Sequence, residues 1–222
     1  TQAFKRKATK LGVKFFESSE VISIKNVHKT WITQTNREKI FSKNIVNCTG
    51  AWGQNIAKAL GDKIPILANA LMLIITSPLP LFLDPVVGSE SRALSFKQLS
   101  NGTVLIGGGY LGRARPDRNQ TDLNFYQLSE NVKTAYSLFP IIEKATIVRS
   151  WAGIEGFTPD NLPVIGPGQA DGVFHAFGFS AHGFQMAPAV GKILSDLITN
   201  DPNEYSLDAF RADRFTNSLN YP

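Results

Sequence analysis

The sequence predicts an α/β protein that carries an inserted antiparallel β-sheet, and three observations support this fold class. A strand over Ile45–Thr49 runs through glycine into a helix over Trp52–Leu60, which is the order of a parallel α/β sheet. A second strand, loop and helix follow over Val173–Ile198. Between these units, prolines, long apolar stretches and an Asn101-Gly102 hairpin signal are typical of antiparallel strands.

These changes in predicted secondary structure along the chain divide it into two expected domains. Residues 1–61 and 151–222 are expected to form one layered α/β domain, and residues 62–150 an inserted mixed β-sheet. Hydrophobic residues make up 43% of the 222 residues, which suffices for a globular core and excludes the disordered and collagen-like classes.

The first part of the chain predicts a short helix followed by a β-meander. Phe4, Ala8 and Leu11 share one helical face, and Gly12 suits the residue that follows a helix. β-Branched and aromatic residues then predict three short strands, Val13–Phe16, Val21–Ile24 and Thr30–Thr35.

Hydrophobic periodicity places the remaining elements. An apolar stripe from Leu128 to Phe139 predicts a helix that ends before Pro140. The pattern over Pro188–Ile198 predicts another helix, with its proline in the first turn. Apolar runs predict four further strands, Leu94–Phe96, Thr103–Ile106, Val164-Ile165 and Val173–Phe177.

Positive charge is concentrated at the start of the chain. The net charge is +5, and residues 1–43 hold ten of the 23 Lys and Arg residues but three of the 18 Asp and Glu residues. A basic face formed by Lys5, Arg6, Lys7, Lys10 and Lys14 would suit a polyanion. No base-reading motif accompanies it, so we expect no nucleic-acid partner.

Cysteine content and hydropathy limit the expected cellular location and the kinds of site the chain can hold. The single cysteine, Cys48, excludes an internal disulfide and a cysteine-rich metal site, and it favours a reducing, cytoplasmic location. We interpret Cys48 as a small buried hydrophobe and expect no metal site. Prolines interrupt the most hydrophobic segment, Ile64–Val87, so no transmembrane segment is expected.

One motif suggests a dinucleotide site that its surroundings do not support. Residues 107–112 match the spacing G-x-G-x-x-G and follow the strand Thr103–Ile106. A phosphate-binding loop of this type must open a helix, whereas Arg113 to Pro116 cannot begin one at the last glycine. The preceding strand is also the second arm of a hairpin and not the first strand of a βαβ unit, so we do not interpret the motif as a phosphate-binding loop.

Three other segments carry a more specific signal, namely Ile45–Trp52, Trp151–Gly166 and Phe177–Pro188. In order and spacing they resemble the D-amino-acid-oxidase-like family of FAD-dependent oxidoreductases, which includes glycine oxidases, sarcosine oxidases, and subunits of opine oxidases and amino-acid dehydrogenases. The resemblance implies a partial FAD-binding domain of the glutathione-reductase-like kind. Residues 62–150 would then be the substrate-binding domain.

The resemblance also implies which residues contact FAD. Amides of the loop before the last helix would face the pyrimidine end of the flavin, where the helix N-terminus stabilises the negative charge of the reduced ring. The backbone of Val21 would meet the adenine. The implied contacts are Val21, Thr49, Gly50, Ala51, Trp52, Gly153, Ile154, Ser180, His182, Gly183, Phe184, Gln185 and Met186.

Further expectations follow from the same resemblance. Hydride transfer from an amine carbon needs no side-chain base at that carbon, so we expect no catalytic residue and give His182 a loop-shaping role. No cysteine lies near Gly153, so FAD should bind non-covalently. The family's N-terminal glycine-rich unit is absent and the chain opens in mid-helix. We therefore expect a fragment that alone holds FAD weakly or not at all.

Glu155 departs from the family pattern. Many relatives carry an arginine here that binds the substrate carboxylate. Glu155 is expected to meet either a cationic group of the substrate or a neighbouring arginine, and the sequence leaves both readings open. Arg92, Tyr110, Arg113 and Arg115 in the inserted sheet are candidates for holding a carboxylate, with solvated surface side chains as the alternative.

Two functions are consistent with these features. The first is a fragment of a FAD-dependent oxidoreductase that oxidises the C–N bond of an amino acid, N-substituted amino acid or opine by hydride transfer to flavin. Its partners would be the small amine substrate and the missing N-terminal FAD half. The alternative is a non-catalytic portion of a hetero-oligomeric amine dehydrogenase that docks substrate or a second subunit.

Overall fold

The computed structural model describes residues 1–215, so residues 216–222 of the expected segment 151–222 lie outside the described range. The α-helices are α1 (Gln2–Lys10), α2 (Gly53–Ala59), α3 (Phe125–Leu138) and α4 (Gly183–Thr199). The 3-10 helices are η1 (Gly50–Trp52), η2 (Pro116–Arg118), η3 (Pro140–Lys144), η4 (Asp208–Phe210) and η5 (Ala212–Phe215). The strands are β1 (Val21–Val27), β2 (Thr30–Thr35), β3 (Lys39–Ser42), β4 (Ile45–Asn47), β5 (Leu67–Thr76), β6 (Val87–Gly88), β7 (Ser95–Gln98), β8 (Val104–Gly107), β9 (Leu111–Arg115), β10 (Gln120–Asp122), β11 (Ile147–Phe157), β12 (Val164–Pro167) and β13 (Val173–Phe177).

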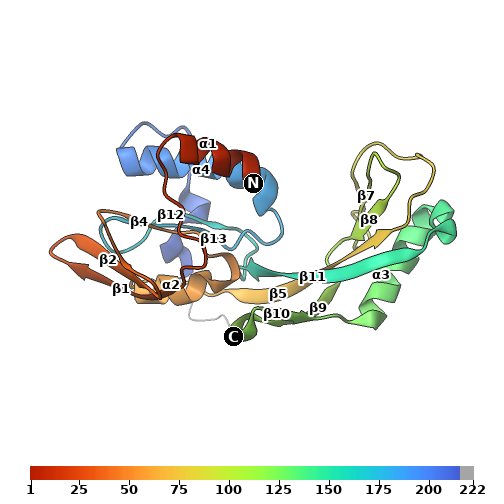
Figure 1. The fold of residues 1–222 in the computed structure, drawn as a ribbon, viewed down its shortest axis with the longest axis horizontal. Helices are drawn as coiled ribbons and strands as arrows, with labels where there is room; N and C mark the ends of the chain where they lie inside the picture. Colours follow the sequence, from red (N-terminus) through yellow and green to blue (C-terminus); the bar gives the residue numbers. More distant parts are fainter. Residues whose placement is uncertain (216–222) are drawn as a thin grey trace.

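The strands form three sheets. One is the meander β1-β2-β3, and another has the order β12-β13-β4, in which β13 and β4 run parallel. The largest sheet has seven strands and is antiparallel. In it, β11 pairs along the whole of β5 on one side, while β8 and β9 share the other side of β5. Figure 1 shows β5 and β11 running side by side from the end that carries α2 and α4 to the end that carries α3.

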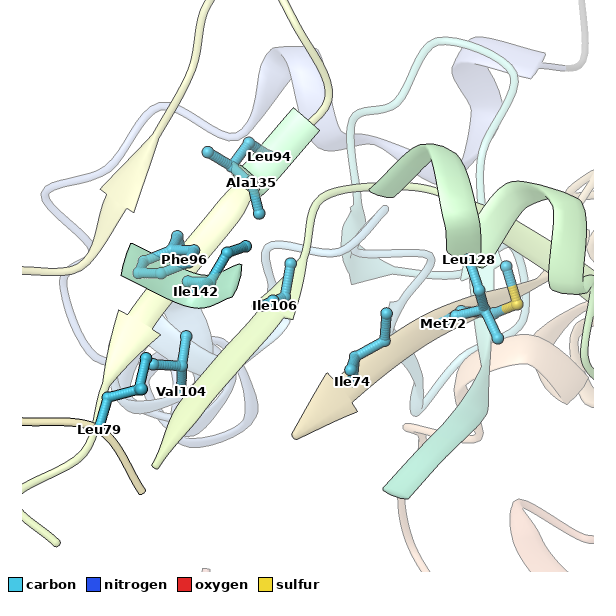
Figure 2. Close-up of a cluster of buried hydrophobic side chains, with 10 residues drawn as sticks. All are labelled: Met72, Ile74, Leu79, Leu94, Phe96, Val104, Ile106, Leu128, Ala135 and Ile142. Atoms are coloured by element: carbon cyan, nitrogen blue, oxygen red, sulfur yellow. The ribbon is translucent and has the colours of Figure 1, made fainter. Parts of the chain in front are cut away.

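The large sheet has one covered face and one open face. Along β5, Ala70, Met72, Ile74 and Thr76 are buried, whereas the residues between them are only partly buried. This alternation is the mark of a strand with one face in the core. Met72 and Ile74 belong to a cluster of ten buried apolar residues that also includes side chains of β7, β8 and α3 (Figure 2).

Strands β12 and β13 sit between two further apolar clusters. Phe177 and Val164 pack with Ala57 of α2 and with Phe215. On the opposite face of the same strands, Ala176 and its neighbour Ile165 pack with the apolar stripe of α4. The strand–turn–helix over β4, η1 and α2 is thereby held against the strand that leads into α4.

Most predicted elements are confirmed, with four differences. Residues Val13–Phe16 form no strand, because they have β propensity but no partner strand to pair with. β4 ends at Asn47, two residues earlier than expected, and η1 follows. α4 begins at Gly183, so Pro188 lies inside the helix and not in its first turn. The expected boundary at residues 150 and 151 falls within β11.

A partly buried ion pair fastens Arg214, near the end of the described residues, to the turn before β12. Arg214 donates through Nε to Asp160 Oδ2 at 2.8 Å and through Nη2 to the Leu162 carbonyl at 2.6 Å. Burial of the Asp160 carboxylate acts to raise its pKa, but hydrogen bonds from Arg214, Leu162 and Thr158 and the Arg214 charge outweigh this and hold that pKa below its ordinary value. The ionised carboxylate therefore contributes to stability.

We expect Arg214→Ala to lower the free energy of unfolding by about 2 kcal/mol at pH 7, since it removes hydrogen bonds to a charged group. Arg211→Ala is the matched control, because the Arg211–Asp213 pair is exposed on both sides, and it should change stability by about 0.5 kcal/mol or less. Because the pKa of Asp160 is lowered on folding, the Arg214 effect should be complete at neutral pH and should shrink as the pH falls below about 4. Equal denaturation midpoints for the two variants at pH 7 would contradict this.

Candidate functional site

The loop before α4 is held in an uncommon backbone conformation. Ser180 and Ala181 both have positive φ, at 49° and 72°, which non-glycine residues rarely adopt. The loop is fixed by hydrogen bonds from the Ser180 amide to the Gly156 carbonyl at 3.2 Å and from the His182 amide to the Phe179 carbonyl at 2.9 Å. These bonds tie the start of α4 to the end of β11.

The first turn of α4 presents free amide groups. Gly183, Phe184 and Gln185 open the 17-residue helix, and amides in a first turn have no carbonyl one turn earlier to bind. Together with the positive end of the helix dipole, they form a site suited to negative charge. The residues expected in a loop, 183–186, are thus the helix start itself.

The turn at η1 lies against the end of β11. A Cβ atom added at Gly156 would come within 2.9 Å of Ala51 Cα and 3.0 Å of the Gly50 carbonyl oxygen. Gly50 has φ +58°, and a Cβ atom there would meet no atom within 4 Å. Trp52 Nε1 donates to the Pro116 carbonyl at 3.0 Å, which joins η1 to η2, directly after β9 of the large sheet. The backbone of Gly50 is therefore packed on one side and open on the other.

Gly153 and Glu155 lie on the open face of the large sheet. Gly153 pairs with Leu71 and Glu155 with Asn69, and directly opposed residues point to the same face. Leu111 on β9 pairs with Leu71 from the other side. A Cβ atom added at Gly153 would meet nothing within 4 Å. The glycine thus leaves a gap in a largely apolar surface that no described side chain fills.

Glu155 connects the open face with the start of α4. Burial raises the pKa of its half-buried carboxyl group, while a hydrogen bond from the Ala181 amide and the charge of His182 act in the opposite direction. Among residues 1–215, no salt bridge joins Glu155 to an arginine. The reading in which a neighbouring arginine pairs with it therefore has no support from the described residues.

Arg113 reaches the same face from β9. It is two residues after Leu111, so strand alternation places it on the open face, and it is exposed. Gly112, the residue before it, pairs with Ala70, the residue after Asn69. Arg113 and Glu155 therefore flank Asn69 from the two strands on either side of β5.

The other predicted site residues lie apart from this group. Val21 begins the edge strand β1 and is 38% exposed. The Tyr110 hydroxyl hydrogen-bonds Thr134 on α3, and Arg92 donates to Ser137 on α3, so both contact the helix on the covered face. A shared substrate role for Tyr110 and Arg92 with Glu155 remains a prediction.

Two interpretations of the sequence are resolved by the structure. Cys48 is exposed and not buried, because Asn47 takes the inward position at the end of β4 and the next side chain points outward. Gly108 and Gly109 lie in a bend between β8 and β9, which run in the same direction along β5, and strand β9 follows them in place of a helix, so the motif at residues 107–112 does not open a helix as a phosphate-binding loop must.

Sequence reasoning missed the apolar floor of this site. Leu71 and Leu73 of β5 and Trp151 of β11 share the open face with Gly153. The sequence of β5 is almost continuously apolar, so it does not reveal that burial alternates along the strand in the folded sheet. Only the register with β11 could have identified which leucines face outward.

The comparisons with known proteins decide the family. Residues 1–197 match the family described as FAD dependent oxidoreductase (DAO). The chain belongs to that family. It is therefore related to flavoprotein oxidoreductases, and the resemblance seen in the three sequence segments is confirmed.

Individual relatives of the DAO family cover almost the whole chain. Sarcosine oxidase subunit beta of Arthrobacter sp is 27% identical over 218 residues, which are 96% of this chain and 52% of that protein. Glycine oxidase of Bacillus subtilis (strain 168) is 26% identical over 218 residues, 96% of this chain and 57% of that protein. The crystal structure of L-proline dehydrogenase from P. horikoshii has a TM-score of 0.89 and 30% identity, covering 97% of this chain and 58% of that chain. The chain spans about half the length of these relatives.

The residues of the site fit the flavin that this family requires. The free amides of α4 suit a ring that gains negative charge, and the gap above Gly153 suits a flat ring or its substrate. Within residues 1–215, no group of three or more His, Cys, Asp or Glu side chains is placed to hold a metal ion. In the same range, no helix is long and apolar enough to cross a membrane.

We expect the two glycines of β11 to respond oppositely to an added methyl group. Gly153→Ala should leave the thermal unfolding midpoint unchanged or slightly raised, because its Cβ meets open space. Gly156→Ala should cost about 1–3 kcal/mol, because its Cβ would press on the Ala51 backbone. Circular dichroism melts of both variants check this, and equal losses would show that the gap above Gly153 is filled.

Proposed function

We propose that the complete protein containing this chain oxidises the C–N bond of an amino acid, N-substituted amino acid or opine with bound FAD. The observation that carries the proposal is that the loop leading into α4 lies beside Glu155 on the open sheet face, held by hydrogen bonds from the Ala181 amide to Glu155 and from the Ser180 amide to Gly156. A flat ring between them would have hydrogen-bond donors at one edge and an apolar floor beneath. When bound, the flavin supplies the acceptor for the hydride of the amine carbon.

The chain's own residues would orient the reactants. Amides of Gly183, Phe184 and Gln185 would hold the edge of the ring that becomes negative, since they are fixed before the reaction begins. Leu71, Leu73 and other apolar side chains of the open face would exclude water from the substrate. Gly50 would allow close approach of backbone to the cofactor.

Arg113 and Glu155 define the substrate class in this proposal. They stand on opposite sides of β5, about 10 Å apart as two strand spacings set it. An arginine and a carboxylate at that separation suit the carboxylate and the amino group of one amino acid. Strand alternation puts both Arg113 and Arg115 on the open face, and Arg113 is favoured for the carboxylate because Arg115 is already paired with Asp122.

The same proposal assigns substrate binding and FAD binding to different parts of the chain. Residues 62–150 with β11 would bind substrate, and the segments around β4, β13 and α4 would bind FAD non-covalently.

A hollow of about 580 Å³ lies between α1 and the start of α4 and is lined by apolar Phe4 and Phe184. We propose that the rest of the FAD-binding half packs in this hollow. The 222-residue chain alone would then hold FAD weakly. We also propose that the protein works in the cytoplasm.

A non-catalytic role is the second candidate. It is favoured by the relative named sarcosine oxidase subunit beta, since a subunit works beside other chains. In that case the open face would dock substrate or a second subunit without FAD. Co-purification of a stable partner, with activity in the complex alone, would support this reading.

We expect the complete protein to be yellow and to lose its absorbance near 450 nm when the correct amino acid is added without oxygen. Screening amino acids, N-methyl amino acids and opines by this bleaching identifies the substrate. A complete, folded protein without flavin absorbance, even after incubation with FAD, would exclude the catalytic proposal.

We expect Arg113→Ala and Glu155→Gln to raise KM for that substrate about tenfold each while changing kcat less, because each removes one charged contact in the bound state. Arg115→Ala is the matched control on the same strand, since its guanidinium is already held by Asp122 at 2.7 Å. An unchanged KM in both site variants would contradict the assignment of the substrate charges.

A further inference from the structure

A chain of buried polar groups runs beneath η1, outside the group just described. Asp62, His175 and Asn47 are 2%, 0% and 1% exposed. His175 Nε2 lies 3.0 Å from Asp62 Oδ2, and His175 Nδ1 lies 3.4 Å from Asn47 Nδ2. Asn47 is the register partner of His175 on the neighbouring parallel strand.

The orientation of the Asn47 side chain is fixed by its other contacts. Its Nδ2 donates to the Gly53 carbonyl at 3.0 Å, and its Oδ1 accepts from the Thr49 amide at 3.2 Å and from the Thr49 hydroxyl at 2.6 Å. A carbonyl can only accept and an amide N–H can only donate, so the two ends of the Asn47 amide cannot be exchanged.

This orientation determines the proton position on His175. Asn47 presents an N–H group to Nδ1, so Nδ1 must accept and Nε2 must carry the proton. That proton is donated to Asp62, whose carboxylate also accepts from the Gln169 amide at 3.1 and 3.3 Å. Every member of the chain is thereby satisfied in the interior, as buried polar groups require.

The chain ends on the turn that would face the cofactor. Its last acceptor, Asn47 Oδ1, binds both the amide and the hydroxyl of Thr49, and Gly50 follows with its positive φ. At the other end, Asp62 is fixed after α2 by a hydrogen bond from its amide to the Ala57 carbonyl at 2.9 Å. The network thus joins the two ends of α2 through β4 and β13.

We propose that His175 is a positioning residue that, held by Asp62 and acting through Asn47, fixes the Thr49–Gly50 turn for FAD; this rests on the proposed function. The network contains no nucleophile and ends on backbone atoms, so its role is orientation and not acid–base chemistry. Gly168 supports it, since a Cβ atom there would lie 2.6 Å from Asp62 Oδ2.

The test compares three variants of the complete protein. His175→Phe keeps a flat ring but removes both nitrogens, and His175→Gln keeps a donor that can reach Asp62. Leu128→Ala, a buried residue of α3 in the core of the large sheet, is a destabilised control that does not touch the network. The measurements are the FAD dissociation constant, amide hydrogen exchange of residues 47–53, and the unfolding midpoint.

In His175→Phe, we expect hydrogen exchange of residues 47–53 to accelerate and the FAD dissociation constant to rise, each about tenfold, as loss of a buried hydrogen-bond network predicts. His175→Gln should show a smaller rise, and Leu128→Ala should change both values by about twofold or less despite its lower midpoint. Equal effects of His175→Phe and Leu128→Ala would overturn the proposal.

A nitrogen NMR spectrum of the wild-type protein provides an independent test that needs no variant to fold. It should show the His175 proton on Nε2, and a proton on Nδ1 would overturn the proposal. Absence of FAD binding by the wild-type protein would instead overturn the proposed function, and hydrogen exchange and NMR would still report whether the network fixes the turn.

Discussion

The pairing of β11 with β5 is the interaction on which the other features depend. Its register runs from Ile147 opposite Thr76 to Phe157 opposite Leu67. At one end β11 lies in the sheet covered by α3, and at the other its backbone touches η1 and the loop before α4. Because backbone hydrogen bonds fix the spacing and faces of paired strands, this one ladder decides which residues stand beside the start of α4.

The site that results is made mostly of backbone. Free amides at the start of α4, the open side of Gly50 and the gap above Gly153 require fixed main chain more than reactive side chains. That is consistent with a family in which the cofactor supplies the chemistry and the protein supplies position and electrostatics. Two further features fix the main chain at this site. The buried Asp62–His175–Asn47 hydrogen bonds hold the turn after β4, and the left-handed conformation of Ser180 and Ala181 sets the loop before α4.

The sequence predicts the local parts of this arrangement well and the long-range parts poorly. The strand–turn–helix at β4 and α2, the hairpin at Asn101-Gly102 and the helix α4 follow from turn residues and periodicity, and the family follows from three motifs. β11 was not predicted as one strand, because its glycines and lack of alternation hide a conformation that pairing with β5 imposes. The contact of Asp62 with His175 is invisible for the same reason, since it depends on how β13 lies against β4 and α2.

The most direct test of the whole account is a crystal structure of the complete protein with FAD and a substrate analogue. We expect the flavin ring to lie against the first turn of α4 and the analogue to lie over the open face at Gly153, between Arg113 and Glu155. A flavin bound elsewhere, or an open face covered by protein in the absence of substrate, would contradict it.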